Sequence, residues 1–342
     1  MSAARALPAH WRSRGVLAWL LWPLSLLFRL LAALRRGAYR CGALRTARLP
    51  VPVVVIGNII AGGAGKTPLT LHLAQALAAL GHHPLIVSRG YGGAGDGVRR
   101  VLPDGDARDC GDEALLLARR AGVPVWVGRR RAEAARAALA QHPECDLVLC
   151  DDGLQHYALA RDIEIAVLDR RGLMNGLHLP AGPLREPAAR LGNVDALVIN
   201  GGGDLPAAIR RNAAPVFRMV LRGDTFVRLD RPQERVQAEA LRGQRLHALA
   251  GIGEPARFFD HLRALGLEFT AHAFADHHVY SAQDLRFPAC DGLLLTEKDA
   301  VKCHGLSDAP VWVLPVEACL DPDLAGHVSA RIAELMHGSP SS

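Results

Sequence analysis

VPVVVIGNIIAGGAGKTPLTLHLAQALAAL, residues 51–80, contains a strand, a glycine-rich loop and a helix in succession. The uncharged, β-branched run at 53–56 predicts a strand covered on both faces, as in a parallel α/β sheet. The glycines that follow predict a loop, and the apolar residues from Leu69 onward predict a helix. We therefore expect an α/β fold organised around this unit.

The loop carries the features of a phosphate-binding P-loop. Its glycines allow backbone N–H groups to converge on one anion, and the N-terminus of the following helix favours negative charge. A lysine would supply a point charge for ATP, and the threonine after it is a Mg²⁺ ligand in such loops. The sequence predicts nucleotide contacts at eight consecutive residues: Ile60, Ala61, Gly62, Gly63, Ala64, Gly65, Lys66 and Thr67.

One position departs from the strict pattern GxxxxGK[ST], because Ile60 stands where that pattern has glycine. The Gly-Gly-x-Gly-Lys-Thr core resembles the deviant P-loops of the MinD and ParA ATPases. Their additional lysine would fall at Ala61, so activation of a dimer by that lysine is not supported. A plain glycine-rich turn is the alternative, but strand, Gly-Lys-Thr and helix coincide here.

A second strand ends in carboxylates. The apolar run 147–150 is followed by Asp151 and Asp152, which is the Walker B arrangement for holding Mg²⁺ downstream of a P-loop. A helix cap or a turn residue is the alternative role of Asp151.

Several further loops at expected strand or helix ends carry polar residues, and open α/β sheets bind ligands at the carboxyl ends of their strands. Taken alone, each has a plain structural explanation, such as a connection, a helix-start carboxylate or surface histidines. The candidates are Arg89 and Tyr91 in 88–93, Asp112 and Glu113 at a helix start, Gln155 and His156 after the Walker B strand, Arg185 in 179–187, and His277 and His278 in 274–280.

Composition limits the possible partners. The chain of 342 residues is half hydrophobic, which suffices for two α/β units, and its net charge of +6 fits a phosphate-bearing partner such as an anionic lipid surface. Aromatic residues make up 5%, too few to favour a base-stacking surface, so we expect no nucleic acid. Seven cysteines without a CxxC pair indicate a reduced, cytosolic setting and no zinc site. The sequence does not specify an oligomeric state.

The N-terminal segment differs from the rest. Residues 16–34 are almost wholly apolar, contain Pro23 and have arginines on both sides. This pattern favours a helix lying in the cytoplasmic interface of a membrane, with a membrane span and a buried core helix as alternatives. We expect this segment at 1–48, a P-loop core at 49–215, a β linker at 216–240, a C-terminal α/β domain at 241–337 and a tail at 338–342. Within this scheme Val194–Asn200 closes the first sheet and 216–229 forms a linking hairpin.

Seven segments, in order, resemble one family: GNIIAGGAGKTP, SRGYGG, GDEALLLA, DDGLQH, LPAGPLREP, ADHHVY and TEKDAVK. The chain resembles tetraacyldisaccharide 4'-kinase, the lipid A kinase of Gram-negative bacteria, over about residues 15–335. The resemblance implies a P-loop NTPase-like α/β/α sandwich with a second, smaller α/β domain and an N-terminal apolar helix. It implies transfer of the ATP γ-phosphate to the 4'-hydroxyl of a membrane glycolipid, tetraacyldisaccharide 1-phosphate, giving lipid IVA at the cytoplasmic face of the inner membrane.

The resemblance also implies residue roles. Asp112 would be the general base with His277 as its partner, and Asp151 and Asp152 would hold Mg²⁺ or the reacting groups. Ala114 and Ala275 stand where the family usually has proline, and the departure at Ala275 leaves the neighbouring His278 as a competitor for the role of His277. A MinD-type regulatory ATPase and a membrane scaffold with a relic P-loop are the rival classes.

Overall fold

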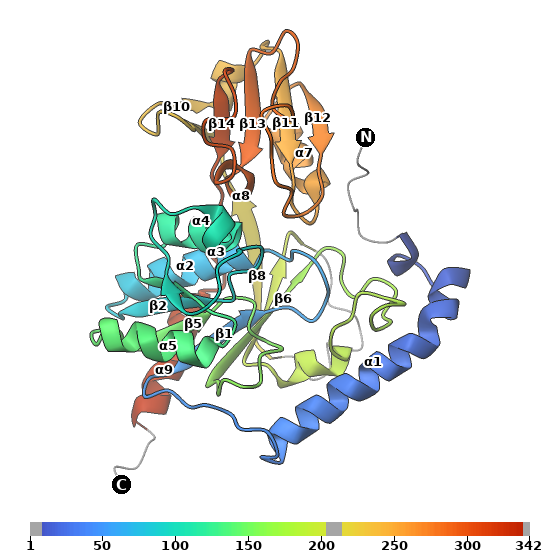
Figure 1. Cartoon of the computed structure of the whole chain (residues 1–342), viewed down its shortest axis with the longest axis vertical. Coiled ribbons are helices and arrows are strands. Elements are labelled where there is room, and N and C mark those ends of the chain that lie inside the picture. Colours follow the sequence, from blue (N-terminus) through green and yellow to red (C-terminus); the bar gives the residue numbers. More distant parts are fainter. Residues whose placement is uncertain (1–8, 203–213, 338–342) are drawn as a thin grey trace.

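Two β-sheets organise the computed structural model, which describes residues 9–202 and 214–337 (Figure 1). In the described residues the larger sheet has the strand order β15 (Glu317–Asp321), β8 (Val216–Arg222), β7 (Ala196–Asn200), β6 (Ile163–Asp169), β1 (Val53–Gly57), β5 (Leu147–Cys150), β2 (Pro84–Ser88), β4 (Val125–Val127) and β3 (Arg99–Arg100). The smaller sheet has the order β10 (Arg235–Gln237), β9 (Thr225–Arg228), β14 (Val311–Leu314), β13 (Gly292–Thr296), β11 (Leu246–Ala250) and β12 (Phe269–Ala273).

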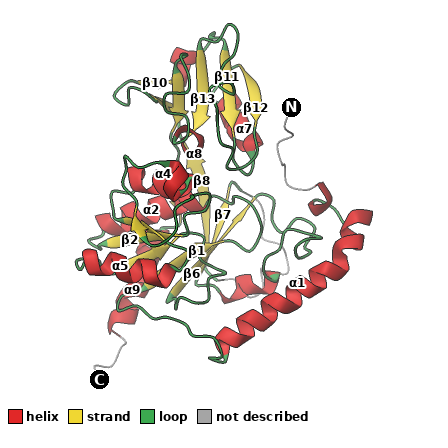
Figure 2. Cartoon of the chain, in the orientation of Figure 1, coloured by secondary structure: helices red, strands yellow, loops and turns green. Residues whose placement is uncertain are grey.

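Helices lie on both faces of the larger sheet, and one long helix lies apart from it along the side of the molecule (Figure 2). The α-helices are α1 (Val16–Arg40), α2 (Lys66–Ala79), α3 (Ala107–Cys110), α4 (Asp112–Arg120), α5 (Arg131–Gln141), α7 (Pro255–Ala264), α8 (Glu297–Ala300) and α9 (Leu324–His337). Short 3₁₀ helices are η1 (Ala9–Trp11), η2 (Ala188–Asn193) and η3 (Ala238–Leu241).

The strand β1 is central, as its uncharged sequence predicts. It pairs in parallel with β5 on one side and β6 on the other, and all five of its residues are buried. Because side chains alternate across a strand, Val54 and Ile56 pack with α2, α4 and α9, whereas Val53 and Val55 pack with α5. The α/β/α sandwich with a second, smaller α/β unit is therefore confirmed.

The edge of the larger sheet differs from prediction. Val194–Asn200 does not close this sheet, because β8 pairs in parallel with β7 and β15 pairs antiparallel with β8. The predicted hairpin at 216–229 is also wrong: β8 lies in the larger sheet, while β9 lies in the smaller one. An alternating pattern identifies each strand but not its partner.

The C-terminal segment also joins the larger sheet. The strand β15 pairs with β8, and α9 packs its buried Val328 and Ile332 into the same core as α2. Strand pairing therefore assigns 317–337 to the larger unit rather than to the C-terminal unit expected over 241–337. The predicted tail, 338–342, and residues 203–213 of the predicted core lie outside the described residues.

The N-terminal helix α1 is mostly exposed, with Ala18 and Ser25 as its buried residues. In the part of the chain that the structure describes, it is the single helix long and apolar enough to cross a membrane by length and composition. It is not a buried core helix, which was one of the alternatives. Its exposed apolar residues make it a candidate membrane anchor.

Candidate active site

The P-loop connects β1 to α2 and is shaped by its own backbone bonds. Gly65, at φ 93°, precedes the helix, and a side chain there would meet the Asn200 amide at 2.2 Å. The Asn58 amide donates to the Gly62 carbonyl at 3.0 Å, which closes the loop. Lys66 begins α2, so the lysine and the free N–H groups of the helix start face the same space.

The departure at Ile60 has a structural reason. Its side chain is fully buried, and its backbone forms an antiparallel bridge with Leu184. The Ala61 N–H donates to the Pro183 carbonyl at 2.9 Å, and the Arg185 N–H donates to the Ile59 carbonyl at 2.8 Å. The first half of the loop is therefore held as a short strand by the segment 177–187, where glycine is not required.

The two predicted Walker B carboxylates follow β5 and differ in environment. Asp151 is buried and accepts a hydrogen bond from the Thr70 hydroxyl at 3.1 Å. Burial, together with the charges of Glu113 and Asp152, raises the pKa of Asp151. Asp152 lies 3.4 Å from the Lys66 ammonium, at φ 50°. Burial alone would raise the pKa of Asp152, but neighbouring positive charges outweigh it and lower the pKa.

Arg131 holds the backbone of both aspartates, a role that the sequence did not predict. It is buried, and its guanidinium donates to the carbonyls of Asp151 at 3.0 Å and Asp152 at 2.8 Å. These bonds fix the unusual backbone at the strand end. The run of three arginines at 129–131 indicates positive charge, but it does not indicate which of the three is buried.

The oxygen atoms fit a Mg²⁺ ion. Oδ2 of Asp151 is buried and has no hydrogen-bond partner, as expected of a ligand atom reserved for a cation, whereas Oδ1 of Asp152 faces the Lys66 ammonium at 3.4 Å. Thr67, in the first turn of α2, adds a hydroxyl. Among the described residues there is no cluster of three His, Cys, Asp or Glu side chains able to hold a metal. Mg²⁺ needs no such cluster, because one or two carboxylates and substrate phosphates commonly hold it.

A cleft of about 980 Å³ opens between the sheet edge and α1. It contains all five residues predicted to bind substrate, namely Arg89, Tyr91, Gln155, His156 and Arg185, together with Asp152. The wall from α1 has apolar residues, Phe28, Leu31, Ala32 and Ala33, together with Arg29, Arg35 and Arg36. The opposite wall carries further arginines and the carboxylates Glu113, Asp152 and Glu186. The cleft therefore combines apolar surface with phosphate-compatible arginines.

Two of these residues are fixed by their neighbours. Arg185 lies 3.6 Å from Asp152, and the Gln155 amide donates to Glu186 at 3.0 Å. Burial, followed by the charges of four arginines, lowers the pKa of His156 to about 4, so its imidazole is neutral near pH 7.

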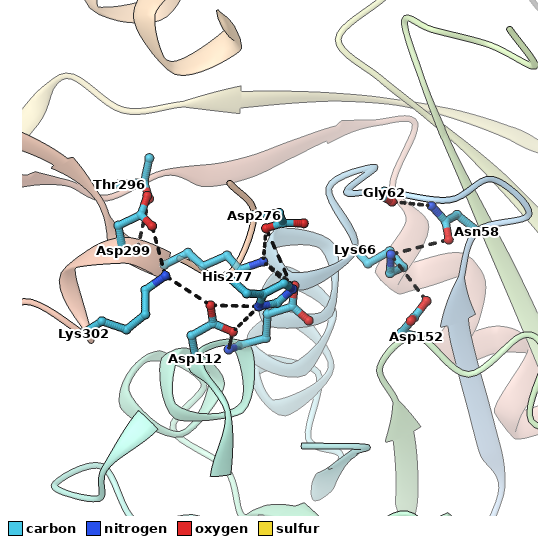
Figure 3. A network of polar contacts seen from close by, with 12 residues as sticks. Asn58, Gly62, Lys66, Asp112, Asp152, Asp276, His277, Thr296, Asp299 and Lys302 are labelled. Carbon is cyan, nitrogen blue, oxygen red and sulfur yellow. Dashed lines mark hydrogen bonds and ion pairs between the residues drawn. The ribbon is translucent and has the colours of Figure 1, made fainter. Parts of the chain in front are cut away.

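Asp112 and His277 form a pair between the two units (Figure 3). Asp112 begins α4, and His277 lies in the loop after β12, with Nδ1 3.0 Å from each carboxylate oxygen. Burial alone would raise the pKa of Asp112, but the His277 hydrogen bond and nearby positive charges lower the pKa to about 2. His278 instead lies 3.4 Å from Asp284, so the structure brings His277 rather than His278 to Asp112.

Two lysines from TEKDAVK surround this pair. Lys302 lies 3.5 Å from Asp112 and 3.2 Å from Asp299, and Lys298 bridges Glu113 at 2.9 Å and Asp276 at 3.1 Å. The sequence motif indicates only positive charge here, and does not show that both lysines pair with carboxylates. Burial alone would lower the pKa of Lys298, but those carboxylates raise it, so the ammonium stays charged.

Contacts connect the pair to the P-loop region. The Tyr91 ring lies 5.0 Å from the His277 ring, and Tyr91 lines the large cleft. Glu113, adjacent to Asp112, lines the same cleft. In the smaller unit, Gly253 lies so close to Gly63 that an added Cβ would be 2.9 Å from the Gly63 nitrogen. Asp112 and His277 themselves line a second cavity of about 600 Å³, so the two halves of the candidate site lie in neighbouring cavities that adjoin at Tyr91 and Glu113.

Comparison with known proteins identifies the family. A family model described as tetraacyldisaccharide-1-P 4'-kinase matches residues 17–333. The chain belongs to this family. The tetraacyldisaccharide 4'-kinase of Azoarcus sp. (strain BH72) is 52% identical over 99% of each chain. That of Dechloromonas aromatica (strain RCB) is 53% identical over 94% of this chain and 95% of its own.

A solved structure agrees with the family assignment. The crystal structure described as "apo" form LpxK from Aquifex aeolicus in complex with ATP matches with a TM-score of 0.78 and 28% identity, covering 94% of this chain and 99% of that one. The predicted family and enzyme class are confirmed. The chain is an ATP-dependent tetraacyldisaccharide 4'-kinase of lipid A biosynthesis, with Mg²⁺ as its metal cofactor.

Proposed function

We propose the following division of labour in the 4'-kinase reaction. Lys66 and the N–H groups of residues 62–67 hold the phosphates of ATP, with Ile60 and Ala61 shaping the loop through the segment 177–187, and Asp112 removes the proton from the 4'-hydroxyl. The observation that carries this proposal is the cleft of about 980 Å³, which joins Asp152, the basic substrate residues and the apolar wall of α1. Such a cleft fits a phosphorylated sugar that carries acyl chains.

The reaction requires charge neutralisation and one proton transfer. The 4'-hydroxyl oxygen forms a bond to the γ-phosphorus while the bond from that phosphorus to the ADP oxygen breaks. The hydroxyl proton passes to the Asp112 carboxylate, and His277, at 3.0 Å, orients this carboxylate and shares its proton. Lys66 meets the negative charge on the transferred phosphoryl group, and Asp152 fixes the lysine at 3.4 Å.

Thr67, Asp151 and Asp152 would hold Mg²⁺, which supplies charge neutralisation on the phosphates when bound. The buried Oδ2 of Asp151, which has no hydrogen-bond partner, supports this assignment. Thr70, at 3.1 Å from Asp151, orients the buried carboxylate without using its second oxygen.

Substrate contacts come from both walls of the cleft. Arg89 and Arg185 offer guanidinium groups to substrate phosphate, whereas Gln155, neutral His156 and Tyr91 suit the hydroxyl groups of a sugar. The apolar side chains of α1 that line the cleft, Phe28, Leu31 and Ala32, suit the acyl chains. One chain segment therefore contacts both the lipid and the membrane that contains it.

We further propose that α1 places the enzyme on the cytoplasmic face of the inner membrane. The exposed Val16, Leu20 and Leu27 would enter the acyl region, and Trp19 and Trp22 suit the headgroup boundary. Arginines at both ends of the helix, including Arg35 and Arg36, would attract anionic phospholipid.

The substrate assignment is tested by incubating the enzyme with ATP, Mg²⁺ and a detergent-dispersed tetraacyldisaccharide monophosphate. We expect a bisphosphorylated product, and Arg185→Ala should raise the KM for the lipid more than that for ATP. Arg245→Ala is the matched control, because Arg245 is exposed and pairs with Asp291 in the smaller unit. Equal effects of the two variants would contradict the proposed role of Arg185.

The membrane assignment is tested by substitutions rather than by truncation, which would also remove the contacts of α1 with the core. A variant with Leu20→Asp and Leu27→Asp should shift from vesicles containing anionic phospholipid into the soluble fraction. The control is Leu80→Asp with Leu102→Asp, two residues of similar exposure elsewhere. Unchanged partitioning of the α1 variant would place the anchor elsewhere.

A further inference from the structure

Ser25 stands out on the exposed helix α1. Its side chain is 2% exposed, whereas the neighbouring Leu24, Leu26 and Leu27 are each more than 40% exposed. A membrane anchor needs no buried hydroxyl, and a hydroxyl that is buried must find hydrogen-bond partners. Ser25 therefore has a role that the apolar surface of the helix does not explain.

The hydroxyl of Ser25 binds both ends of a turn in another segment. It donates to the His178 carbonyl at 2.8 Å and accepts from the Ala181 N–H at 3.0 Å. Trp11 adds a second contact from the N-terminal segment, donating from Nε1 to the Pro180 carbonyl at 2.9 Å. Replacing this hydroxyl would leave the Ala181 N–H without its partner, while the His178 carbonyl would keep its bond from the Gly182 N–H at 2.9 Å.

The segment that Ser25 holds, residues 177–187, also holds the P-loop. We call it the strap. Within the strap, Leu184 and Leu177 are joined by a backbone bond of 3.0 Å. At its far end, the strap binds Ala61 through the Pro183 carbonyl and Ile59 through the Arg185 N–H. A continuous set of hydrogen bonds thus runs from α1 to the nucleotide loop, and it sets the position of Arg185 beside Asp152.

We propose that Ser25 is a positioning residue for phosphoryl transfer. It acts through the strap. The strap keeps Arg185 and residues 59–61 of the P-loop in a fixed position relative to the lipid bound against α1. The inference rests on the proposed roles of Arg185 and the P-loop. It makes α1 part of the machinery that aligns the two substrates, in addition to its role as a membrane contact.

The test uses Ser25→Ala, which keeps the apolar surface of α1. At saturating lipid in detergent micelles, kcat should fall about three- to tenfold, the effect expected from losing hydrogen bonds that position a reacting group. Partitioning to vesicles should not change. Ser329→Ala is the matched control, because that hydroxyl contacts His82 at 2.9 Å on a part of the core away from the cleft.

A double-mutant cycle separates positioning from simple stability. If Ser25 acts through Arg185, the loss of kcat/KM for the lipid in the variant with both Ser25→Ala and Arg185→Ala should be clearly smaller than the product of the single losses. A Ser25→Ala variant with normal kcat, or losses that multiply, would overturn the inference. Asn175→Ala provides a second variant, since its amide holds the strap at the Ala181 carbonyl at 2.9 Å, and the same pattern is expected.

The same data distinguish this inference from the proposed function. Normal activity of Arg185→Ala would reject the proposed role of Arg185 and, with it, the positioning of Arg185 by Ser25. Reduced activity of Arg185→Ala with normal kcat for Ser25→Ala would leave the proposed function intact and reject the positioning role.

Discussion

The two halves of the candidate site are held together in different ways. Lys66 and Asp152 follow β1 and β5, which are paired neighbours in one sheet, so their approach to 3.4 Å is built into a single unit. Asp112 and His277 are 165 residues apart and come from the larger and the smaller unit. The phosphate-binding half therefore forms within one sheet, whereas the proton-accepting half requires that the two units meet.

Replacing Lys66 should have the largest effect on kcat. This substitution tests the half of the site that is built within one sheet. Lys66→Ala should lower kcat by at least about 10³-fold, since the ammonium meets phosphoryl charge in the transition state. The fold should be retained, because the lysine contacts only Asn58 at 3.5 Å and Asp152 among the polar groups described. Turnover and thermal unfolding check both statements. Activity within about tenfold of the unchanged enzyme, roughly 1.4 kcal/mol in the barrier, would reject the P-loop mechanism.

The pair between the units should give the next largest effect. Asp112→Ala should lower kcat by about 10²- to 10⁴-fold, the usual contribution of general base catalysis. His277→Ala should also lower kcat strongly, and the double variant should be little worse than the poorer single, because the two residues act as one group. ATP affinity should change little.

The adjacent His278 is the matched control for this pair, since it contacts Asp284 instead. His278→Ala should keep near-normal turnover. Losses that multiply in the double variant would show that Asp112 and His277 act separately. Near-normal turnover of Asp112→Ala would reduce this residue to a helix-start carboxylate, worth about 0.3 to 1 kcal/mol of stability.

The same contrast explains what the sequence could predict. The P-loop, the Walker B strand and the helix starting at Asp112 are local patterns, and the structure places each where it was expected. The sequence could not predict which strand pairs with β8, because an alternating strand has the same pattern in either sheet. The antiparallel pairing of β15 with β8 joins segments about a hundred residues apart, for which the sequence offers no signal.

Within the site, the missed residues are those that act on other side chains. Arg131 binds backbone carbonyls, and Lys298 and Lys302 bind carboxylates, although their sequence contexts suggested only positive charge. Ser25 gave no signal, because a small residue inside an apolar run is compatible with any helix. Such roles depend on packing between distant segments, which periodicity and motif spacing do not encode.

The smallest expected effect concerns the pH dependence of stability at the junction of the two units. Burial alone would lower the pKa of His277, but the hydrogen bond to Asp112 and the nearby carboxylates raise the pKa above its usual value. A raised pKa means that the folded protein holds this proton more tightly than the unfolded chain. The stabilisation is therefore complete below about pH 6.5 and is lost as the pH rises through the folded pKa. For Asp112, whose pKa is lowered to about 2 in the folded protein, the stabilisation is present above about pH 4 and is lost on acidification through pH 2.

The pair should thus contribute most between about pH 4 and 6.5, the window set by these two shifts. Compared with the double variant Asp112→Asn with His277→Gln, the unchanged enzyme should gain about 1 to 2 kcal/mol in free energy of unfolding at pH 5.5, and clearly less at pH 9. Urea denaturation in constant detergent measures this difference, with His278→Gln as the control that lacks the Asp112 contact. A gain that grows from pH 5.5 to pH 9 would mean that His277 meets Asp112 as a neutral group. The junction would then be held by Lys298 and Lys302 rather than by the imidazole.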